Sequence, residues 1–425
     1  MNKNIPSSNT RAYHPRIVDD QIRDILGTFG GLLIEGPKWC GKTWTGLHHS
    51  GSALFVGDEK SAYMAKLDPF LALDGEHPRL VDEWQDVPAL WDAARRDIDL
   101  SGTKGRYIFT GSSVPPKGST HHTGTGRFAR LRMRPMSLFE TGDSSGTVSL
   151  SHIFGGGAIA SAKSGMNYRK AVNLICKGGW PDALGMDGER AMKIPREYIQ
   201  AVRDSDISRA DGRRRSKTNT ELLLRSLARN SASPVKISVL TEDMRENGSS
   251  ITPNTVSGYL DALRSIFVAE EQNAWSPMLR SRSRIRTSPK RHFTDPSLAA
   301  AALKASPDIL ARDANTAGFL FESLCYRDLS VYASAVHGEV YHYLDNTGLE
   351  VDEIIELRDG RWGAAEVKMG ISEFEKGADN LLSLAEKVKD KMGPPSFLMI
   401  LNATGGLSYT RDDGVSVVPI DLLGP

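Results

Sequence analysis

A glycine-rich octapeptide constrains this chain more than any other feature. Residues 36 to 43 read GPKWCGKT, a complete GxxxxGK[ST] pattern, and the apolar run Gly31–Glu35 precedes them like a buried parallel strand. In this context glycines let backbone amides wrap phosphates, Lys42 reaches the β and γ oxygens, and the Thr43 hydroxyl binds Mg²⁺. We therefore expect ATP and Mg²⁺ as cofactors. The expected nucleotide ligands are Gly36, Pro37, Lys38, Trp39, Cys40, Gly41, Lys42 and Thr43.

Two adjacent carboxylates follow about forty residues later, at the end of the apolar segment that begins at Arg79. Asp82 is expected to hold Mg²⁺ together with Thr43, while Glu83 orients the attacking water, because phosphoryl transfer depends on positioning and charge stabilisation. The alternative is an acidic pair in a surface turn.

A third short strand, which starts at Gly105, leads into two hydroxyl residues, Thr110 and Ser112. Either hydroxyl could contact the γ-phosphate and sense its loss, or could serve as a turn residue that satisfies backbone donors. Arg127 follows Gly126 and lies outside the alternation of Arg130, Arg132 and Arg134, which is typical of a half-buried strand. Arg127 is thus the candidate arginine finger, supplied across a subunit boundary, with a purely structural arginine as the alternative.

These segments resemble the AAA-type P-loop ATPases of bacteria and archaea that carry a carboxy-terminal winged helix and PD-(D/E)xK-like domain. The resemblance covers nearly the whole chain. It depends on GPKWCGKT, on Val81 to Gln85, on Thr110 to Ser113, on Gly126-Arg127 and on Pro135 to Glu140. Further matches are Gly178 to Pro181, Phe321-Glu322, Glu350 to Asp352 and Glu366 to Lys368, whereas Leu344 and Glu353 depart from the family pattern.

The chain of 425 residues is long enough for several domains. The resemblance implies an α/β protein with an AAA-type ATPase core, a small helical segment, a winged helix and a C-terminal α/β restriction-endonuclease-like domain. We expect the ATPase core in residues 1–150, the small helical segment in 151–208, a basic linker and winged helix in 209–292, and the nuclease-fold domain in 293–425. No apolar run is long enough to span a membrane and the amino terminus lacks a secretory signal, so a cytoplasmic location is expected.

A helix that begins with Thr252-Pro253 carries the buried stripe of the predicted winged helix, and two short strands are expected at 267–270 and 272–275. The basic run from Arg280 to Arg291 contains no acidic residue. Such a module binds either DNA phosphates or a protein partner. The expected DNA-binding residues are Asn254, Ser257, Arg264, Arg282, Arg284 and Arg286.

A second acidic group lies near the carboxy terminus. Residues 349–357 and 362–367 are typical of a β-hairpin that would bring Asp352 opposite Glu366 and Lys368, with Glu322 on the preceding helix. One interpretation is a Mg²⁺-dependent nuclease site, in which Glu322, Asp352, Glu366 and Lys368 hold and tune the cation. The other is a charged strand pair with ordinary cross-strand salt bridges.

Three functional hypotheses follow. The first is a hexameric ATPase ring that moves or remodels DNA, including branched DNA such as a Holliday junction. The second is an endonuclease gated by ATP, and the third is a nucleotide-dependent switch that binds protein. A narrow preference goes to DNA binding, over cutting, as the role of the last domain.

Overall fold

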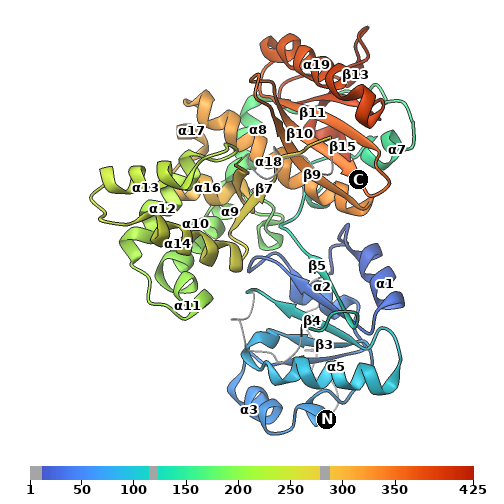
Figure 1. The fold of residues 1–425 in the computed structure, drawn as a ribbon, viewed down its shortest axis with the longest axis vertical. Coiled ribbons are helices and arrows are strands. Elements are labelled where there is room, and N and C mark those ends of the chain that lie inside the picture. Colours follow the sequence, from blue (N-terminus) through green and yellow to red (C-terminus); the bar gives the residue numbers. More distant parts are fainter. Residues whose placement is uncertain (1–11, 114–122, 278–287) are drawn as a thin grey trace. The chain divides into compact units, whose positions relative to one another are not determined.

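The computed structural model describes residues 12–113, 123–277 and 288–425. The chain forms two compact units (Figure 1). The first holds the chain up to Pro135 with the short segments Ala210–Gly212 and Ser265–Phe267, and the second holds the remainder. Among the described residues, no helix is both long and apolar enough to cross a membrane. The four predicted domain ranges divide the chain more finely than these two units, and they stay predictions.

The first unit is built on a parallel sheet with the strand order β2-β3-β4-β1-β5. Leu33 faces one core cluster, which includes Trp91 and Phe109, whereas Leu32 faces another, so both sides of the sheet are covered. Its strands are β1 Gly31–Glu35, β2 Ser52–Phe55, β3 Arg79–Asp82, β4 Tyr107–Gly111 and β5 Phe128–Arg132. Its helices are α1 Asp19–Thr28, α2 Lys42–His48, α3 Glu59–Leu67, α4 Pro69–Ala72 and α5 Ala89–Ser101.

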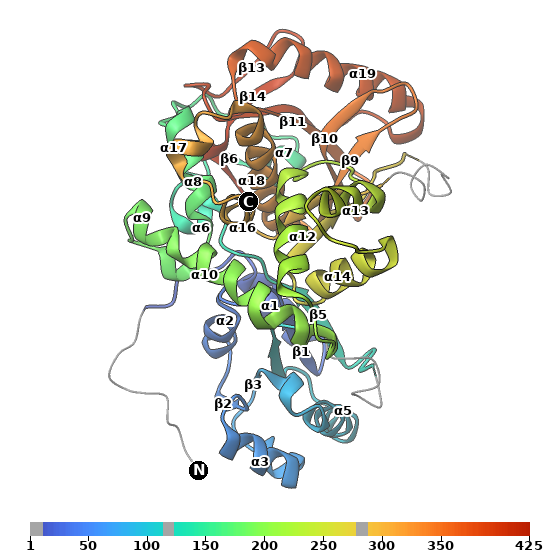
Figure 2. The same ribbon diagram turned by 90° about the vertical axis from the view of Figure 1, so that its left-hand side faces the viewer.

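The second unit begins with short elements and continues with packed helices (Figure 2). Ser137 and Glu140 form a reciprocal capping box on its first helix. Gly179 is required where it lies, because a Cβ there would be 1.9 Å from the Met136 carbonyl oxygen. The first elements are α6 Leu138–Thr141, β6 Val148–Ser149, α7 Leu150–Phe154, α8 Tyr168–Lys177, α9 Gly188–Ala191, α10 Lys193–Ala201 and α11 Ile207–Asp211.

Three helices and a hairpin follow in the order predicted for the winged helix. Thr252 accepts a hydrogen bond from the Thr255 amide and so caps α14, as expected. The second strand was predicted wrongly, because β8 begins only at Lys290 and residues 272–275 do not form the return strand. The elements are α12 Lys217–Arg229, α13 Ile237–Glu246, α14 Pro253–Ser265, β7 Ala269–Gln272 and β8 Lys290–Phe293, then α16 Pro296–Ala302 and α17 Pro307–Leu310.

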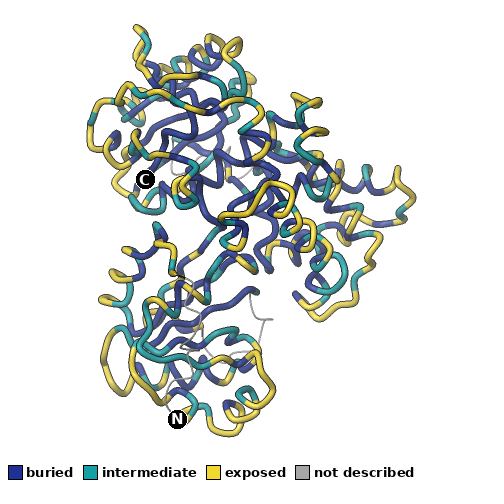
Figure 3. Tube along the Cα trace, turned by 180° about the vertical axis from the view of Figure 1, so that it is seen from behind, coloured by how far each residue is buried: buried dark blue, intermediate teal, exposed yellow. Residues whose placement is uncertain are grey.

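The carboxy-terminal part forms a six-stranded sheet with the order β13-β14-β12-β11-β10-β9. Helices α18 Ala314–Ala335 and α19 Phe374–Met392 pack on opposite faces of this sheet (Figures 1 and 2), and its strands are largely buried (Figure 3). The predicted hairpin is confirmed, since β10 and β11 pair antiparallel. The strands are β9 Gly338–Leu344, β10 Glu350–Leu357, β11 Trp362–Lys368, β12 Leu398–Asn402, β13 Tyr409–Thr410 and β14 Ser416–Pro419, while β15 Leu423–Gly424 pairs with β6.

Candidate functional site: a nucleotide loop and a second acidic centre

The glycine-rich loop connects the carboxyl end of β1 to the amino end of α2. Gly36 must lack a side chain, since a Cβ would lie 2.1 Å from the Met133 carbonyl oxygen. Gly41 caps α2 with φ +101°, a left-handed conformation that favours glycine. The Lys42 side chain is buried, and its ammonium donates to the Pro37 carbonyl oxygen at 2.7 Å. The loop therefore curls around a positive charge at a helix start, which is the arrangement that receives phosphate groups.

Asp82 lies at the carboxyl end of β3, two strands away from the loop. The hydroxyls of Thr43 and Thr110 both donate to its Oδ1 atom, at 2.8 Å and 2.5 Å. Burial raises the pKa of Asp82 above its usual range, and these hydrogen bonds offset only part of that rise. The two residues predicted to hold Mg²⁺, Thr43 and Asp82, are thus in direct contact beside the loop, and their oxygens are the type that Mg²⁺ prefers.

Glu83 follows in the left-handed backbone conformation, with φ 55° and ψ 42°. Such a conformation is costly for a residue with a side chain and persists where the surroundings hold it. Ser112 donates to Glu83 Oε2 at 3.1 Å, and the Gln85 amide donates to the same oxygen. The two predicted sensor residues therefore each contact one carboxylate in this structure: Thr110 contacts Asp82, and Ser112 contacts Glu83.

Arg127 lies at the other end of the sheet. It immediately precedes β5, whose first residue Phe128 pairs with Gly31 at the amino end of β1, whereas the phosphate loop leaves the carboxyl end. Its guanidinium forms an ion pair with Asp99 of α5 at 2.7 Å, and the side chain is 45% exposed. Arg127 therefore does not contact the nucleotide loop of its own chain, and both of its predicted roles, an arginine finger for a neighbouring subunit and a structural arginine, stay predictions.

Sequence reasoning missed a buried arginine beneath the loop. Arg16 donates to the carbonyl oxygens of Cys40 and Arg134, at 2.8 Å and 2.9 Å. It thereby ties the loop and the segment after β5 to the start of the chain. No sequence pattern marks Arg16, because its partners are distant in the chain. By contrast, Gln85 was within reach of prediction, since it belongs to the same short segment as Asp82 and Glu83.

The second acidic centre lies where α18, β10 and β11 meet. The structure brings together the four residues predicted for it. Lys368 contacts Asp352 at 3.4 Å and also contacts Glu366, while the Val367 amide donates to Asp352 at 2.9 Å. Glu322 approaches from α18 and shares a partner, described next, with Asp352. A β-bulge between Val351 and Ile354 interrupts the pairing of β10 with β9 at this point, and bulges commonly re-aim side chains.

The shared partner is Lys290 of β8, which was not predicted. Its ammonium lies 2.7 Å from Glu322, 2.9 Å from Glu350 and 3.3 Å from Asp352, and its side chain is 1% exposed. Lys290 and Arg291, the last two basic residues of the run that begins at Arg280, are both buried in β8. Nothing in the local sequence distinguishes Lys290 from the arginines before it.

Charge in this centre is distributed unevenly. Burial alone would raise the pKa of Asp352, but Lys290 and Lys368 lower it to about 2. Burial raises the pKa of Glu322 to about 7 and that of Glu366 to about 8, and in both cases the Asp352 charge adds to the effect. Burial also lowers the pKa of Lys290, yet the surrounding carboxylates outweigh it and raise the pKa well above its usual value. Lys290 is thus held as a cation.

The prediction that Glu322, Asp352, Glu366 and Lys368 form a metal site is not supported by this geometry. Among the residues that the structure describes, no group of three or more acidic, histidine or cysteine side chains is arranged to hold a metal ion. Mg²⁺ requires oxygens at roughly 2.0–2.1 Å in octahedral geometry. Here the Lys290 ammonium lies within ion-pairing distance of two of these carboxylates, Glu322 and Asp352, and Lys368 pairs with Glu366. The alternative interpretation, a network of salt bridges, matches the observed contacts.

The residues predicted to contact DNA are only partly described. Asn254 is exposed and Ser257 partly exposed on α14. Arg264 is exposed but forms ion pairs with Asp261 and, at 2.6 Å, with Glu271, so its charge is already compensated. Arg282, Arg284 and Arg286 lie outside the described residues.

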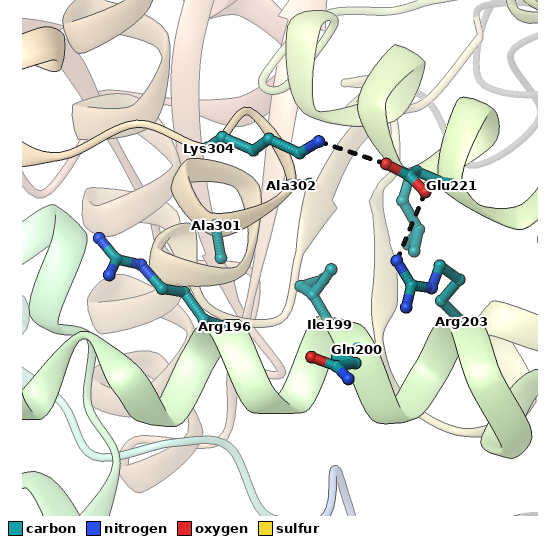
Figure 4. A pocket seen from close by; sticks show the side chains of 9 residues that line it. Arg196, Ile199, Gln200, Arg203, Glu221, Ala301, Ala302 and Lys304 are labelled. Carbon is teal, nitrogen blue, oxygen red and sulfur yellow. Dashed lines mark hydrogen bonds and ion pairs between the residues drawn. The ribbon is translucent and has the colours of Figure 1, made fainter.

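A pocket in the second unit was not predicted from the sequence (Figure 4). Helices α10, α12 and α16 supply most of its lining, which combines an apolar floor with three cationic side chains. Glu221 pairs with Arg203 and with Lys304, each at 3.5 Å, which compensates part of this positive charge. Its lining residues are Arg196, Ile199, Gln200, Arg203, Glu221, Leu224, Ala301, Ala302 and Lys304.

Comparison with known proteins gives a partial assignment. Residues 29–142 match the model of an AAA domain. The first unit is therefore similar to an AAA domain. Residues 168–309 and 317–423 match two domains of unknown function, DUF8612 and DUF4143, so the winged helix and the PD-(D/E)xK-like domain stay predictions. No curated protein matches the sequence.

Two solved structures are similar at low identity. The Walker-type ATPase PABY2304 of Pyrococcus abyssi is 13% identical, with a TM-score of 0.42, and the match covers 68% of this chain and 96% of that one. The Aeropyrum pernix ORC1 protein in complex with DNA is 12% identical, with a TM-score of 0.27, and the match covers 72% of this chain and 96% of that one.

Proposed function

We propose that this chain is a cytoplasmic ATP-dependent motor that moves or remodels DNA, working as a hexameric ring. The observation that carries the ATPase part is the convergence of Lys42, Thr43, Asp82 and Glu83 at the carboxyl edge of neighbouring parallel strands. Ligands bind at this edge in open α/β sheets, because the loops and helix starts that follow the strands gather there.

Each residue of the proposed nucleotide site has a distinct task. On nucleotide binding the Lys42 ammonium leaves the Pro37 carbonyl oxygen. Together with the loop amides, it then holds the phosphates. Thr43 and Asp82 would hold Mg²⁺, which supplies charge neutralisation at the β- and γ-phosphates. Glu83 accepts a hydrogen bond from the attacking water and orients it. Ser112 and Gln85 fix the position of the Glu83 carboxylate.

Support for DNA as the substrate comes from the middle of the chain. Helices α12, α13 and α14 followed by the β7–β8 hairpin have the element order of a winged helix. α14 presents Asn254 and Ser257 on its accessible side. In sequence, most of the basic run that begins at Arg280 falls between β7 and β8, and clustered arginines favour phosphate binding. Branched DNA such as a four-way junction is our preferred substrate.

One assay tests the proposal. The purified chain is incubated with linear, forked and four-way DNA, with and without ATP and Mg²⁺, and the products are separated by native and denaturing gels. We expect strand separation or junction movement that requires ATP hydrolysis, and loss of both in Glu83→Gln. An Asn254→Ala/Ser257→Ala variant should retain ATP hydrolysis but bind DNA more weakly, whereas the exposed substitution Lys304→Ala should change neither property.

Other outcomes would favour the remaining hypotheses. Metal-dependent cutting would favour an ATP-gated nuclease, although the Lys290 contacts give it no support. ATP hydrolysis with no effect on any DNA would instead favour a nucleotide-dependent switch that binds protein.

A further inference from the structure

The environment of Lys290 is unusual for a lysine. Lysines are almost never fully buried unless they are paired, and this one has carboxylates from two elements around its ammonium: Glu322 from α18, with Glu350 and Asp352 from β10. The ammonium donates to Glu322 Oε1 at 2.7 Å and to Asp352 Oδ1 at 3.3 Å. A divalent ion bridging these two residues would bind the same carboxylates.

Lys290 and a divalent ion would therefore compete for Glu322 and Asp352. An ammonium already within hydrogen-bonding distance repels a second cation, and it blocks the approach to roughly 2 Å that Mg²⁺ coordination demands. Displacing the buried Lys290 ammonium from its carboxylate partners without exposing it to water would leave an unpaired buried charge, which is strongly unfavourable.

The rest of the hairpin is attached to the same centre. From β7, the Gln272 amide donates to the Asp352 carbonyl oxygen at 3.0 Å and to the Glu353 carboxylate at 2.7 Å. From β8, His292 bonds Ser323 of α18 at 3.0 Å and Gln272 at 3.2 Å. All five side chains are buried. The acidic centre thus joins two sequence regions, the hairpin and the carboxy-terminal sheet.

We propose that the Lys290 ammonium takes the place of a divalent cation in this centre, which clamps the β7–β8 hairpin onto the carboxy-terminal sheet and does not cut DNA. The centre keeps the residue types of a nuclease site, but its cation is a side chain. Because the contacts are independent of the nucleotide loop, the proposal does not rest on the proposed ATPase motor.

Metal binding and thermal stability test the proposal in the nucleotide-free chain of 425 residues. An Asp82→Asn background removes the Mg²⁺ ligand of the nucleotide site from the readout. In this background we expect no protein-bound Mn²⁺ by electron paramagnetic resonance, so that the signal of free Mn²⁺ is not reduced, and a melting temperature that Mn²⁺ leaves unchanged. Adding Lys290→Met, which keeps a long unbranched side chain but removes its charge, should lower the melting temperature by about 10 °C. It should also create a Mn²⁺ site that partly restores stability.

The controls separate this effect from general damage. Lys304→Met removes a lysine whose side chain is 82% exposed and should change neither readout. Asp352→Asn added to Lys290→Met should abolish Mn²⁺ binding. The proposal is overturned if Lys290→Met melts like its parent or gains no Mn²⁺ site. It is equally overturned if the chain with Lys290 intact binds Mn²⁺ and loses it on Asp352→Asn, a comparison that decides the matter even where Lys290→Met does not fold.

Discussion

At the scale of single residues, hydroxyl groups of the nucleotide site donate hydrogen bonds to its two carboxylates and fix their positions. Thr43 and Thr110 converge on one oxygen of Asp82, and Ser112 supports Glu83. Such contacts fix the carboxylates before any ligand arrives, so less reorganisation is needed during the reaction. The left-handed backbone at Glu83 is consistent with this, because local strain is tolerated where a side chain must point in one direction.

Two substitutions should separate binding from turnover. Lys42→Ala removes the charge inside the loop and should abolish tight ATP binding, whereas Glu83→Gln leaves the loop intact and should bind ATP normally. The second variant should lower kcat on the order of 100-fold or more, because it cannot polarise the attacking water. Isothermal titration with a slowly hydrolysed ATP analogue measures binding, and phosphate release measures turnover.

The matched control is Lys60→Ala, which removes an exposed lysine of α3, outside the phosphate loop. It should retain most of both properties. Normal hydrolysis by both Lys42→Ala and Glu83→Gln would remove the basis for the nucleotide assignment.

At the scale of elements, the meeting of α18, β10 and β11 concentrates carboxylates in a buried place. The pKa of Glu322 is raised to about 7 and that of Glu366 to about 8. Both values exceed that of the unfolded chain, so the native state retains protons that the unfolded chain has released above about pH 4.5. The contribution of these two glutamates to the free energy of unfolding therefore falls as pH rises from about 4.5 to about 8. Asp352 behaves oppositely, but only in acid, because its pKa is lowered to about 2.

We predict that the second unit is more stable near pH 5.5 than near pH 8.5, by on the order of 2 kcal/mol. Glu366→Gln mimics the protonated side chain and should reduce this difference. Urea denaturation followed by tryptophan fluorescence at both pH values measures it. Glu386→Gln, an equivalent change at an exposed position of the adjacent helix α19, should leave the difference unchanged. An identical pH dependence in Glu366→Gln and the wild type would refute the raised pKa of Glu366.

At the scale of the whole molecule, Arg127, the predicted arginine finger, does not contact the phosphate loop of its own chain. Arg127 lies at the opposite end of the sheet, where Asp99 holds it on the surface. In a ring, one subunit's phosphate loop can face the next subunit's Arg127, and each site would then contain residues from two chains.

Subunit mixing tests this arrangement. Arg127→Ala should lower hydrolysis by a factor of ten or more at about unchanged ATP affinity. Mixing Arg127→Ala with Glu83→Gln subunits should restore part of the activity, because some interfaces combine an intact Glu83 with an intact Arg127. Arg95→Ala, which removes the other arginine partner of Asp99, should remain active without mixing. No recovery, together with monomers in light scattering with ATP and DNA, would favour the switch over the motor.

The sequence by itself determined the features whose chemistry is local. The GxxxxGK[ST] loop, the Asp82-Glu83 pair, the capped helix at Pro253 and the β10–β11 hairpin all follow from short contiguous patterns, because strand period, capping and turn residues act over a few positions. The grouping of Asp352 with Glu366 and Lys368 follows from the same hairpin. These features could be read without knowing where distant segments lie.

Only the tertiary structure decided what the second acidic centre contains. Lys290 belongs by sequence to a basic run, yet β8 carries it into a buried site among carboxylates of α18 and β10. Arg16 likewise supports the nucleotide loop from a segment that precedes α1. The physical reason is the same in both cases. The role of a charged side chain depends on the groups around it, and here those groups come from residues far apart in the chain. Whether an acidic cluster holds a metal ion or an ammonium therefore depends on packing that no local pattern encodes.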